Sequence, residues 1–486
     1  MRIIHFAGML LLACAVAAAA PPVPAPAEDA GKGLRQDFAT DPGWDGYRNR
    51  LVTEPAPLTR QHFGWSDTSY AGGKSRGEIG GRVQRSTTPA RYARVIAERT
   101  LNDRLRASGR FAVTKDDGNS SVLFGFFNEN SRGWRTNNSL VIRLDGNASG
   151  YIVFYEYGTH SYLAHGGGAY EGERWQTTST KPKLPDGTSH AWTLSYDPNG
   201  AGGDGLITLA LDGETFELPL RPGHKKEGAT FNRFGILNGQ TTGGGMDCWF
   251  DELEIDGERI DLTADPKWEA KGNHVEFADR VRRPLQDFGF SPKTSHAGGK
   301  SAGEIGGIVW RDETPAFYAK PLKSLDLDRE LKASGTLVFC NAGSDSGVWF
   351  GWFDAKSRKA AAAEMNDSGK QSNFLGILIE GPSRVGHYFR PGYRTSAAEG
   401  AIPEDGPLIR PDGKVHRWTL HYRPDGANGN GRIEVTFDGA VQTLDLRPGD
   451  RHRGATLDRF GLFTAWPGGH HTEVYLDDLS YTGTPN

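Results

Sequence analysis

Two glutamates stand in nearly identical glycine-rich stretches, and each has the space around it that a ligand site requires. Glu304 lies in "AGGKSAGEIGG" (297–307), and Glu78 lies in "AGGKSRGEIGG" (71–81). Because glycine lacks a side chain, a ligand or another backbone segment can approach such a carboxylate closely. Either glutamate could hydrogen-bond a ligand or transfer a proton; the alternative is a buried carboxylate bonded to an arginine or to loop amides. We favour the structural interpretation, because a fold motif must recur in both copies of a repeat, whereas an enzyme seldom keeps two complete active sites.

The second half of the chain also carries aromatic and polar side chains suited to a hydroxyl-rich ring. Aromatic faces stack on the apolar faces of sugar rings, and a few polar groups fix the orientation of the ligand. The predicted catalytic residues are Glu304, His387 and Tyr388. The predicted ligand-binding residues are Trp310, Arg311, Trp349, Trp352, Arg390, Tyr393 and Trp466, together with Glu78 and Arg85 of the first half. Packing in the core is the alternative role for half or more of the aromatic residues.

The first half is poorer in tryptophan at the equivalent positions. It has Gln84, Leu123 and Phe126 where the second half has tryptophans. Its own polar and aromatic set is Trp134, Tyr155, Tyr157, His160, Tyr162 and His165. We therefore predict that the second half carries the site.

Two aspartates near the ends of the halves, Asp251 in "WFDEL" and Asp477 in "YLDDL", are candidates for binding Ca²⁺ through oxygen. An aspartate that caps a turn is the alternative, and no D-x-D-x-D loop accompanies either residue. His470 and His471 are adjacent, so on a strand they point to opposite faces and do not form a metal site together. We expect no required cofactor, with a structural Ca²⁺ as the one candidate.

All of these residues belong to a unit that the chain contains twice. Adding 226 to a first-half position reaches its counterpart, so that "PDGTSHAWTLSY" (185–196) corresponds to "PDGKVHRWTLHY" (411–422). One offset that holds across most of each half indicates two copies of one fold and not a short-period solenoid. We predict a first domain over 28–261 and a second over 262–486. No long linker separates them, which favours a monomer with packed tandem domains.

Each unit has the sequence pattern of short β-strands. Runs such as "SGYIVFYEY" (149–157) and "GRIEVTFDG" (431–439) are rich in β-branched and aromatic residues and are bounded by turn residues. Loops such as "DPNGAGGDG" (197–205) have hairpin composition. Only 100–108 and 327–334 have helix-compatible patterns. The sequence therefore predicts an all-β chain of two tandem β-sandwiches of the jelly-roll type.

Composition and the first residues bear on partners and location. The net charge is −4, so the chain has no basic surplus for a phosphate backbone, and nucleic acid is not an expected partner. Residues 1–27 have the pattern of a signal peptide cleaved after Ala27, which predicts a secreted or periplasmic protein. A lipid anchor on Cys14 is the less favoured alternative. No later stretch is long enough to span a bilayer, and Cys248 and Cys340 are expected to be unpaired thiols.

Motifs in the back half of each unit carry a resemblance. "W-T-L-x-Y", a glycine-rich turn, "D-G", "R-F-G" and a closing "D-E-L" or "D-D-L" follow one another within 185–255 and 411–482. In this order they resemble the concanavalin A-like lectin/glucanase superfamily. The resemblance implies a sandwich that binds or cleaves glycans on a concave sheet face, and a structural calcium in several members. The glucanase pattern E-x-D-x-x-E is not found, and "YFRPGY" (388–393) resembles only one part of an alginate-lyase pattern.

These observations lead us to expect an exported protein that recognises a polysaccharide through the concave face of its sandwiches. Recognition is favoured because the known catalytic patterns are missing. The first alternative is a glycoside hydrolase or polysaccharide lyase, with a site around Glu304, Arg311, His387, Tyr388 and Arg390. The second is an envelope structural protein whose domains pair with a partner protein.

Overall fold

The structure is a computed structural model in which strands predominate. It describes residues 33–147, 150–168, 182–279, 281, 285–312, 314–343, 346–357, 372–381, 387–464 and 469–486. Helical segments within these ranges are the short turns η1 (Ala201–Gly203), α1 (His224–Glu227), α2 (Gly426–Gly429) and α3 (Asp450–Arg453). No described helix has the length and apolar character needed to cross a membrane. The prediction of an all-β chain is confirmed.

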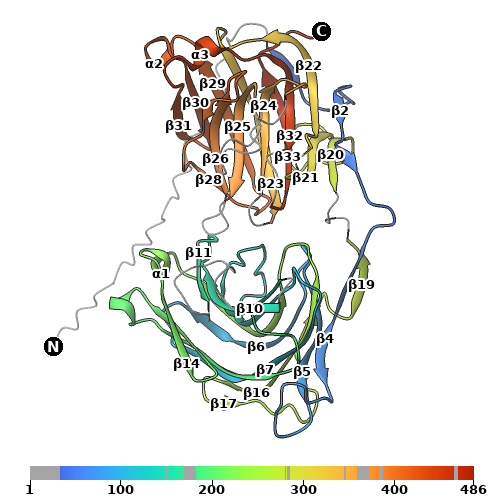
Figure 1. Ribbon diagram of the computed structural model, residues 1–486, viewed down its shortest axis with the longest axis vertical. Coiled ribbons are helices and arrows are strands. Elements are labelled where there is room, and N and C mark those ends of the chain that lie inside the picture. Colours follow the sequence, from blue (N-terminus) through green and yellow to red (C-terminus); the bar gives the residue numbers. More distant parts are fainter. Residues whose placement is uncertain are drawn as a thin grey trace, which may run out of the picture.

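The first sandwich consists of two antiparallel sheets around one core (Figure 1). Across the first back sheet the order is β14 (Glu214–Pro219), β13 (Leu206–Leu211), β12 (Ser189–Asp197), β7 (Leu105–Asp116), β16 (Gly245–Ile255), β5 (Glu78–Gln84), β4 (Leu58–Ser66) and β19 (Val275–Ala278), with β17 (Glu258–Arg259) paired to β16. Across the first front sheet it is β11 (Ala164–Gly168), β10 (Gly150–Gly158), β9 (Ser139–Asn147), β8 (Ser121–Phe127), β15 (Thr230–Asn238), β6 (Arg91–Thr100) and β18 (Glu269–Lys271). The rings of Phe124 and Phe250, one from each sheet, stack in the core with centroids 3.9 Å apart.

The second sandwich repeats this plan. Across the second back sheet the order is β3 (Arg50–Leu51), β20 (Gln286–Ser291), β21 (Glu304–Trp310), β33 (His471–Tyr481), β23 (Leu331–Ala342), β29 (Val415–Arg423), β30 (Arg432–Phe437) and β31 (Ala440–Asp445), with β1 (Leu34–Gln36) paired to β33. Across the second front sheet it is β2 (Asp45–Tyr47), β22 (Phe317–Leu325), β32 (Leu457–Thr464), β24 (Ser346–Phe353), β25 (Phe374–Gly381), β26 (His387–Arg394) and β27 (Gly400–Ala401), with β28 (Leu408–Ile409) paired to β26. Phe460 and Tyr481 stack in this core with centroids 4.1 Å apart.

Equivalent bonds confirm the repeat. The Tyr196 hydroxyl donates to the Leu101 carbonyl at 2.8 Å, and the Tyr422 hydroxyl donates to the Leu327 carbonyl at 2.6 Å. The helix-compatible pattern at 100–108 is wrong for the same reason in both copies. A tight turn joins two strands there, and alternating apolar residues enter the core from Leu105 onward.

The segment that precedes each sandwich completes the other sandwich. Residues 34–51 form β1, β2 and β3, which pair with β33, β22 and β20 of the second sandwich. Residues 269–278 form β18 and β19, which pair with β6 and β4 of the first. Figure 1 shows the two crossings, with the blue β2 beside β22 and the olive β19 beside β4. Hydrogen-bonded sheets therefore cross the boundary that we predicted at residue 262.

Side chains fix the exchanged segments as firmly as the strand pairing does. Trp44 is buried and packs against Tyr318 and Tyr481, with centroids 5.8 Å and 6.1 Å away. Trp268 packs against Tyr92, the first-half counterpart of Tyr318, at 5.8 Å. Trp44 therefore belongs to the core of the second sandwich, and the partly buried Trp268 packs against the core of the first.

Replacing Trp44 tests this exchange. Trp44→Ala removes a buried indole from the second core, so we expect that sandwich to lose about 3–5 kcal/mol of stability. Hydrogen exchange should show reduced protection in β22 and β33 and unchanged protection in β6 and β16. Val441→Ala, at a 61% exposed position of the same sandwich, is the control and should change stability by less than about 0.5 kcal/mol. Unchanged protection in β22 and β33 would contradict the exchange.

Candidate functional site

The glutamate of each repeated motif, Glu78 or Glu304, anchors the preceding glycine-rich loop to its strand. Glu78 is buried, and it accepts hydrogen bonds from the Thr68 hydroxyl (2.5 Å) and from the amides of Tyr70 and Ala71 (2.8 Å each). Glu304 is equally buried and contacts the Ala297 amide (2.8 Å) and a histidine Nδ1 (2.5 Å). All four carboxylate oxygens thus hold the glycine-rich loops. This is the structural interpretation, and the location gives no support to catalysis by Glu304.

The three predicted catalytic residues do not converge. Ile305 is in the core, so the alternation of the strand directs Glu304 to the outer face of the second back sheet. Phe389 is in the core as well, so its neighbour Tyr388 lies on the outer face of the second front sheet. His387 is buried between these faces and its Nε2 lies 2.7 Å from the Ser346 hydroxyl. The core of the sandwich therefore separates Glu304 from Tyr388.

Two of the predicted ligand contacts are core residues. Trp352 and Tyr393 are fully buried. The indole N–H of Trp352 donates to the Thr482 carbonyl at 2.9 Å, and the Tyr393 hydroxyl donates to Asp450 at 2.6 Å. Their position is incompatible with contact to a ligand in the folded protein. The alternation of large apolar residues that made them look like a binding surface comes from packing between the sheets.

The other predicted aromatic contacts are also enclosed. Trp349 belongs to an apolar cluster with Phe374 and Phe463 on the outer face of the second front sheet and is 3% exposed. Trp310 is 4% exposed and lies 5.2 Å from the ring of His471. Trp466 lies outside the described residues.

The predicted basic residues of the second half are engaged as well. Arg390 is paired with Glu380 at 2.5 Å and donates to the carbonyl of Pro403 at 2.9 Å, with its guanidinium 5.7 Å from the Tyr388 ring. Arg311 is 4% exposed. The second front sheet thus presents a mainly apolar, covered outer face, and the site that we predicted there stays a prediction.

The calcium candidates, Asp251 and Asp477, share one unusual feature. In each, Oδ1 accepts the amide of the following residue (2.6 Å and 2.7 Å), whereas Oδ2 is buried and has no hydrogen-bond partner within the described chain. A Cβ added at Gly73 or Gly299 would come within 1.7 Å of that Oδ2, so only glycine lets the loop pass this close to the carboxylate. Burial, and with it the negative charges of Asp478 and Glu304, raises the pKa of Asp477 to about 7. A buried oxygen without a donor fits one ligand of a hard cation, although the described residues hold no group of three or more acidic, histidine or cysteine side chains arranged for a metal.

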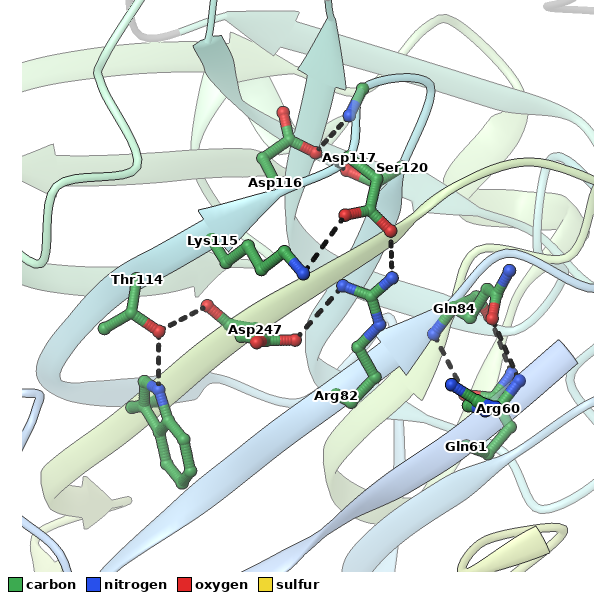
Figure 2. Close-up of polar contacts among 12 residues, drawn as sticks. Arg60, Gln61, Arg82, Gln84, Thr114, Lys115, Asp116, Asp117, Ser120 and Asp247 are labelled. Carbon is green, nitrogen blue, oxygen red and sulfur yellow. Dashed lines mark hydrogen bonds and ion pairs between the residues drawn. The ribbon is translucent and has the colours of Figure 1, made fainter. Parts of the chain in front are cut away.

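The outer face of the first back sheet is a network of internal partners. Figure 2 shows Arg82 between Asp117 and Asp247, with Lys115 in contact with the other carboxylate oxygen of Asp117. It also shows Gln84, the counterpart of Trp310, bonded to Gln61 of the neighbouring strand. These partners satisfy one another, so this face is an ion-paired surface.

The first front sheet carries a cluster that differs from all of these. We call Arg85, Trp134, Arg135, Arg143 and Glu156 the arginine–tryptophan cluster. Arg143 of β9 and Glu156 of β10 point away from the core, because their neighbours Ile142, Leu144 and Tyr155 point into it. Arg85 follows β5, and Trp134 and Arg135 lie on the loop between β8 and β9.

Three guanidinium groups surround one indole ring in this cluster. Their central carbons lie 4.8 Å (Arg143), 5.2 Å (Arg135) and 5.4 Å (Arg85) from the Trp134 ring centroid. Arg135 and Arg143 share Glu156 Oε2, at 2.7 Å and 3.1 Å. Arg85 is paired with Asp145 and donates to Asn119 at 2.8 Å.

Several buried donors of the cluster lack an acceptor. These are Arg85 Nε, Arg143 Nε, Arg143 Nη1 and Trp134 Nε1, for which the described residues provide no hydrogen-bond partner. Arg85 and Arg143 are 4% and 5% exposed. Burial, together with the positive charge of Arg143, lowers the pKa of Arg85. Buried polar groups are nearly always bonded in native structures, so this set marks a place where a partner is missing.

The cluster lies where the two sandwiches meet. Figure 1 shows the first sandwich curving so that β6 and β10 face the second. Arg132, on the Trp134 loop, donates to the Asp412 carbonyl of the second sandwich at 3.1 Å. Thr241 Oγ1 lies 3.3 Å from His470 Nδ1. The second sandwich therefore helps to hold the loop that carries Trp134.

The predicted ligand-binding residues include one member of this cluster, Arg85, and Trp134 appears only in the aromatic set of the half that we did not favour. The available signals were the "SRGWRTNN" loop (131–138), with basic residues on both sides of Trp134, and the lone arginine in the apolar strand "SLVIRL" (139–144). A charged residue in a strand that is apolar on both faces is costly unless paired. An arginine in such a strand therefore indicates that a partner or a ligand compensates its charge.

A buried histidine generates a prediction about pH. Neither ring nitrogen of His471 has a partner within the described residues, and burial, with smaller effects of His470 and His387, lowers its pKa from 6.5 to about 3. Between pH 6.5 and 3 the unfolded chain binds a proton there that the folded chain does not, so stability falls as the pH falls. At pH 5 the loss is about 2 kcal/mol for one histidine.

His471→Phe should therefore reduce the loss of stability between pH 7.5 and 5 by about 2 kcal/mol in denaturant unfolding. The pH-independent packing change cancels in this difference. His452→Phe, at an exposed position, is the control and should leave the pH dependence unchanged. Equal pH dependences of the wild-type protein and His471→Phe would contradict the assignment.

Comparisons with known proteins yield structural similarities only. No family model and no curated protein matches the chain. The chain is similar to domains LG4-5 of the mouse laminin alpha1 chain (13% identity over 88% of this chain and 95% of that one, TM-score 0.25). It is also similar to the lectin UEA-II complexed with galactose (11% identity over 38% of this chain and 89% of that one, TM-score 0.25). A third similar structure is the alginate lyase AlyC3 in complex with dimannuronate (10% identity over 38% of this chain and 75% of that one, TM-score 0.23). At these values no functional argument follows, and the description of the fold as two tandem β-sandwiches rests on the sheet order given above.

Proposed function

We propose that the protein is an exported polysaccharide-binding protein whose first front sheet binds the glycan at the arginine–tryptophan cluster. The observation that carries the proposal is the set of buried donors without acceptors around Trp134. A sugar offers hydroxyl acceptors for such donors and an apolar face for an aromatic ring. Recognition is favoured over catalysis because Glu156 is engaged by two guanidinium groups, which fix its position.

A binding panel tests this function. The full chain is incubated with plant, algal and host glycans, and both retention and new reducing or unsaturated ends are followed. We expect retention of at least one glycan without product. New chain ends would contradict pure recognition, and failure of every glycan to bind would contradict the proposed function.

Substituting Trp134 tests the position of the site. Trp134→Ala should weaken binding about tenfold, which corresponds to about 1.4 kcal/mol. Trp249→Ala is the matched control, because Trp249 is also a partly exposed tryptophan of the first sandwich but lies in the back sheet, bonded to Thr114. Equal binding by the wild-type protein and Trp134→Ala would place the site elsewhere.

We also propose that Asp251 and Asp477 each hold a structural Ca²⁺. The unpartnered Oδ2 atoms supply the oxygen ligands, and the ion would offset the negative charge buried beside the glycine loops. Ca²⁺ in about 100-fold excess over its Kd should stabilise the protein by about 3 kcal/mol. Thermal unfolding of the Asp251→Asn/Asp477→Asn double variant should lose this response, with Mg²⁺ as the control ion. A retained response would contradict these sites.

A further inference from the structure

We propose that the glycan bound at the arginine–tryptophan cluster is acidic, with a carboxylate or sulfate group placed between Arg85 and Arg143. This inference rests on the proposed function and specifies its ligand. It starts from the kind of polar atom that lacks a partner in the cluster.

The unpartnered atoms around the indole are mainly donors. Arg143 uses Nη2 for Glu156, which leaves Nε and Nη1 without an acceptor among the described residues. Arg85 donates from Nη1 to Asn119 and from Nη2 to Asp145, which leaves its Nε without an acceptor among the described residues. Ser121 Oγ and Asp116 Oδ2 are the unpartnered oxygens of the adjoining strands. Each of these N–H groups can donate one charge-assisted hydrogen bond to an oxygen of an anion.

The charges of the cluster also call for an anion. The guanidinium carbons of Arg85 and Arg143 both lie within 5.4 Å of the Trp134 ring centroid. Burial and the charge of Arg143 disfavour the charged form of Arg85, whereas Asp145 and Asp116 favour it. The carboxylates in direct contact, Asp145 and Glu156, are shared among three guanidinium groups. Asp116 lies nearby but is bonded to Ser120 and to the Gly118 amide instead.

A neutral sugar does not compensate the positive charges of Arg85 and Arg143. Its hydroxyl groups can accept hydrogen bonds from the arginines, but they carry no charge and leave the repulsion between Arg85 and Arg143 in place. A carboxylate or sulfate accepts from both side chains and compensates that repulsion. In the second sandwich the front-sheet Arg390 also has an unpartnered Nε, but its other nitrogens are engaged by Glu380 and by two loop carbonyls.

Matched pairs of glycans test the charge requirement. Binding of the full chain is measured by calorimetry with oligogalacturonate and its methyl ester, and with dextran sulfate and dextran. We expect the acidic member of at least one pair to bind at least tenfold more tightly, and the pair that shows the difference identifies the group as carboxylate or sulfate. Equal binding of charged and neutral members would overturn the inference while leaving the proposed function standing. A single-stranded oligonucleotide that binds more tightly than either acidic glycan would overturn it in favour of a phosphate ligand.

Variants locate the acidic group. Arg143→Gln should abolish the preference for the acidic member, whereas Arg390→Gln, at a similarly buried front-sheet arginine of the second sandwich, should preserve it. The opposite result would overturn the assignment. If Arg143→Gln does not fold, Trp134→Phe keeps an aromatic ring and removes the Nε1 donor together with the five-membered part of the indole. It should reduce affinity for the acidic glycan at least threefold, and unchanged affinity would overturn the inference.

Discussion

The structure depends on strand pairing across the boundary between the two halves of the chain. Each sandwich is completed by strands that come from outside its own half. An exposed sheet edge presents unpaired amides and carbonyls that are prone to aberrant pairing. Here residues 34–51 cover strands of the second sandwich, and residues 269–278 cover strands of the first. The two copies of the repeat are thereby linked by exchanged strands in addition to the chain that joins them. The relative position of the sandwiches follows from these crossings and from contacts such as that between Arg132 and Asp412.

This linkage gives the duplicated unit two different surfaces. Both front sheets carry a small apolar cluster, around Trp349 in the second and around Leu123 in the first, but the first adds charged residues such as Arg143 and Glu156. The anchoring glutamates and the aspartates of the last strands are kept in both copies, as expected of parts that build the fold. Function in this account therefore lies in what differs between the copies, and the differing residues are those that face the junction of the sandwiches.

Much of the fold could be predicted from sequence, because alternation, turn residues and one constant offset are local or periodic signals. The sandwich pair, the free thiols Cys248 and Cys340 and the loop-anchoring interpretation of Glu304 all agree with the structure. The strand exchange could not be predicted, because nothing in the segments around Trp44 and Trp268 indicates which copy they pair with. The site could not be predicted for a related reason: tryptophan is equally suited to packing and to binding, and only burial distinguishes Trp352 from Trp134.

The most direct test of the account is a structure of the full chain with a bound acidic oligosaccharide. The account predicts that the sugar lies on the first front sheet at the junction of the sandwiches. Its acidic group should lie within hydrogen-bond distance of Arg143 Nε or Nη1 and of Arg85 Nε, which have no acceptor among the described residues. A sugar bound instead beside Tyr388 and Arg390, with only water at the arginine–tryptophan cluster, would contradict it.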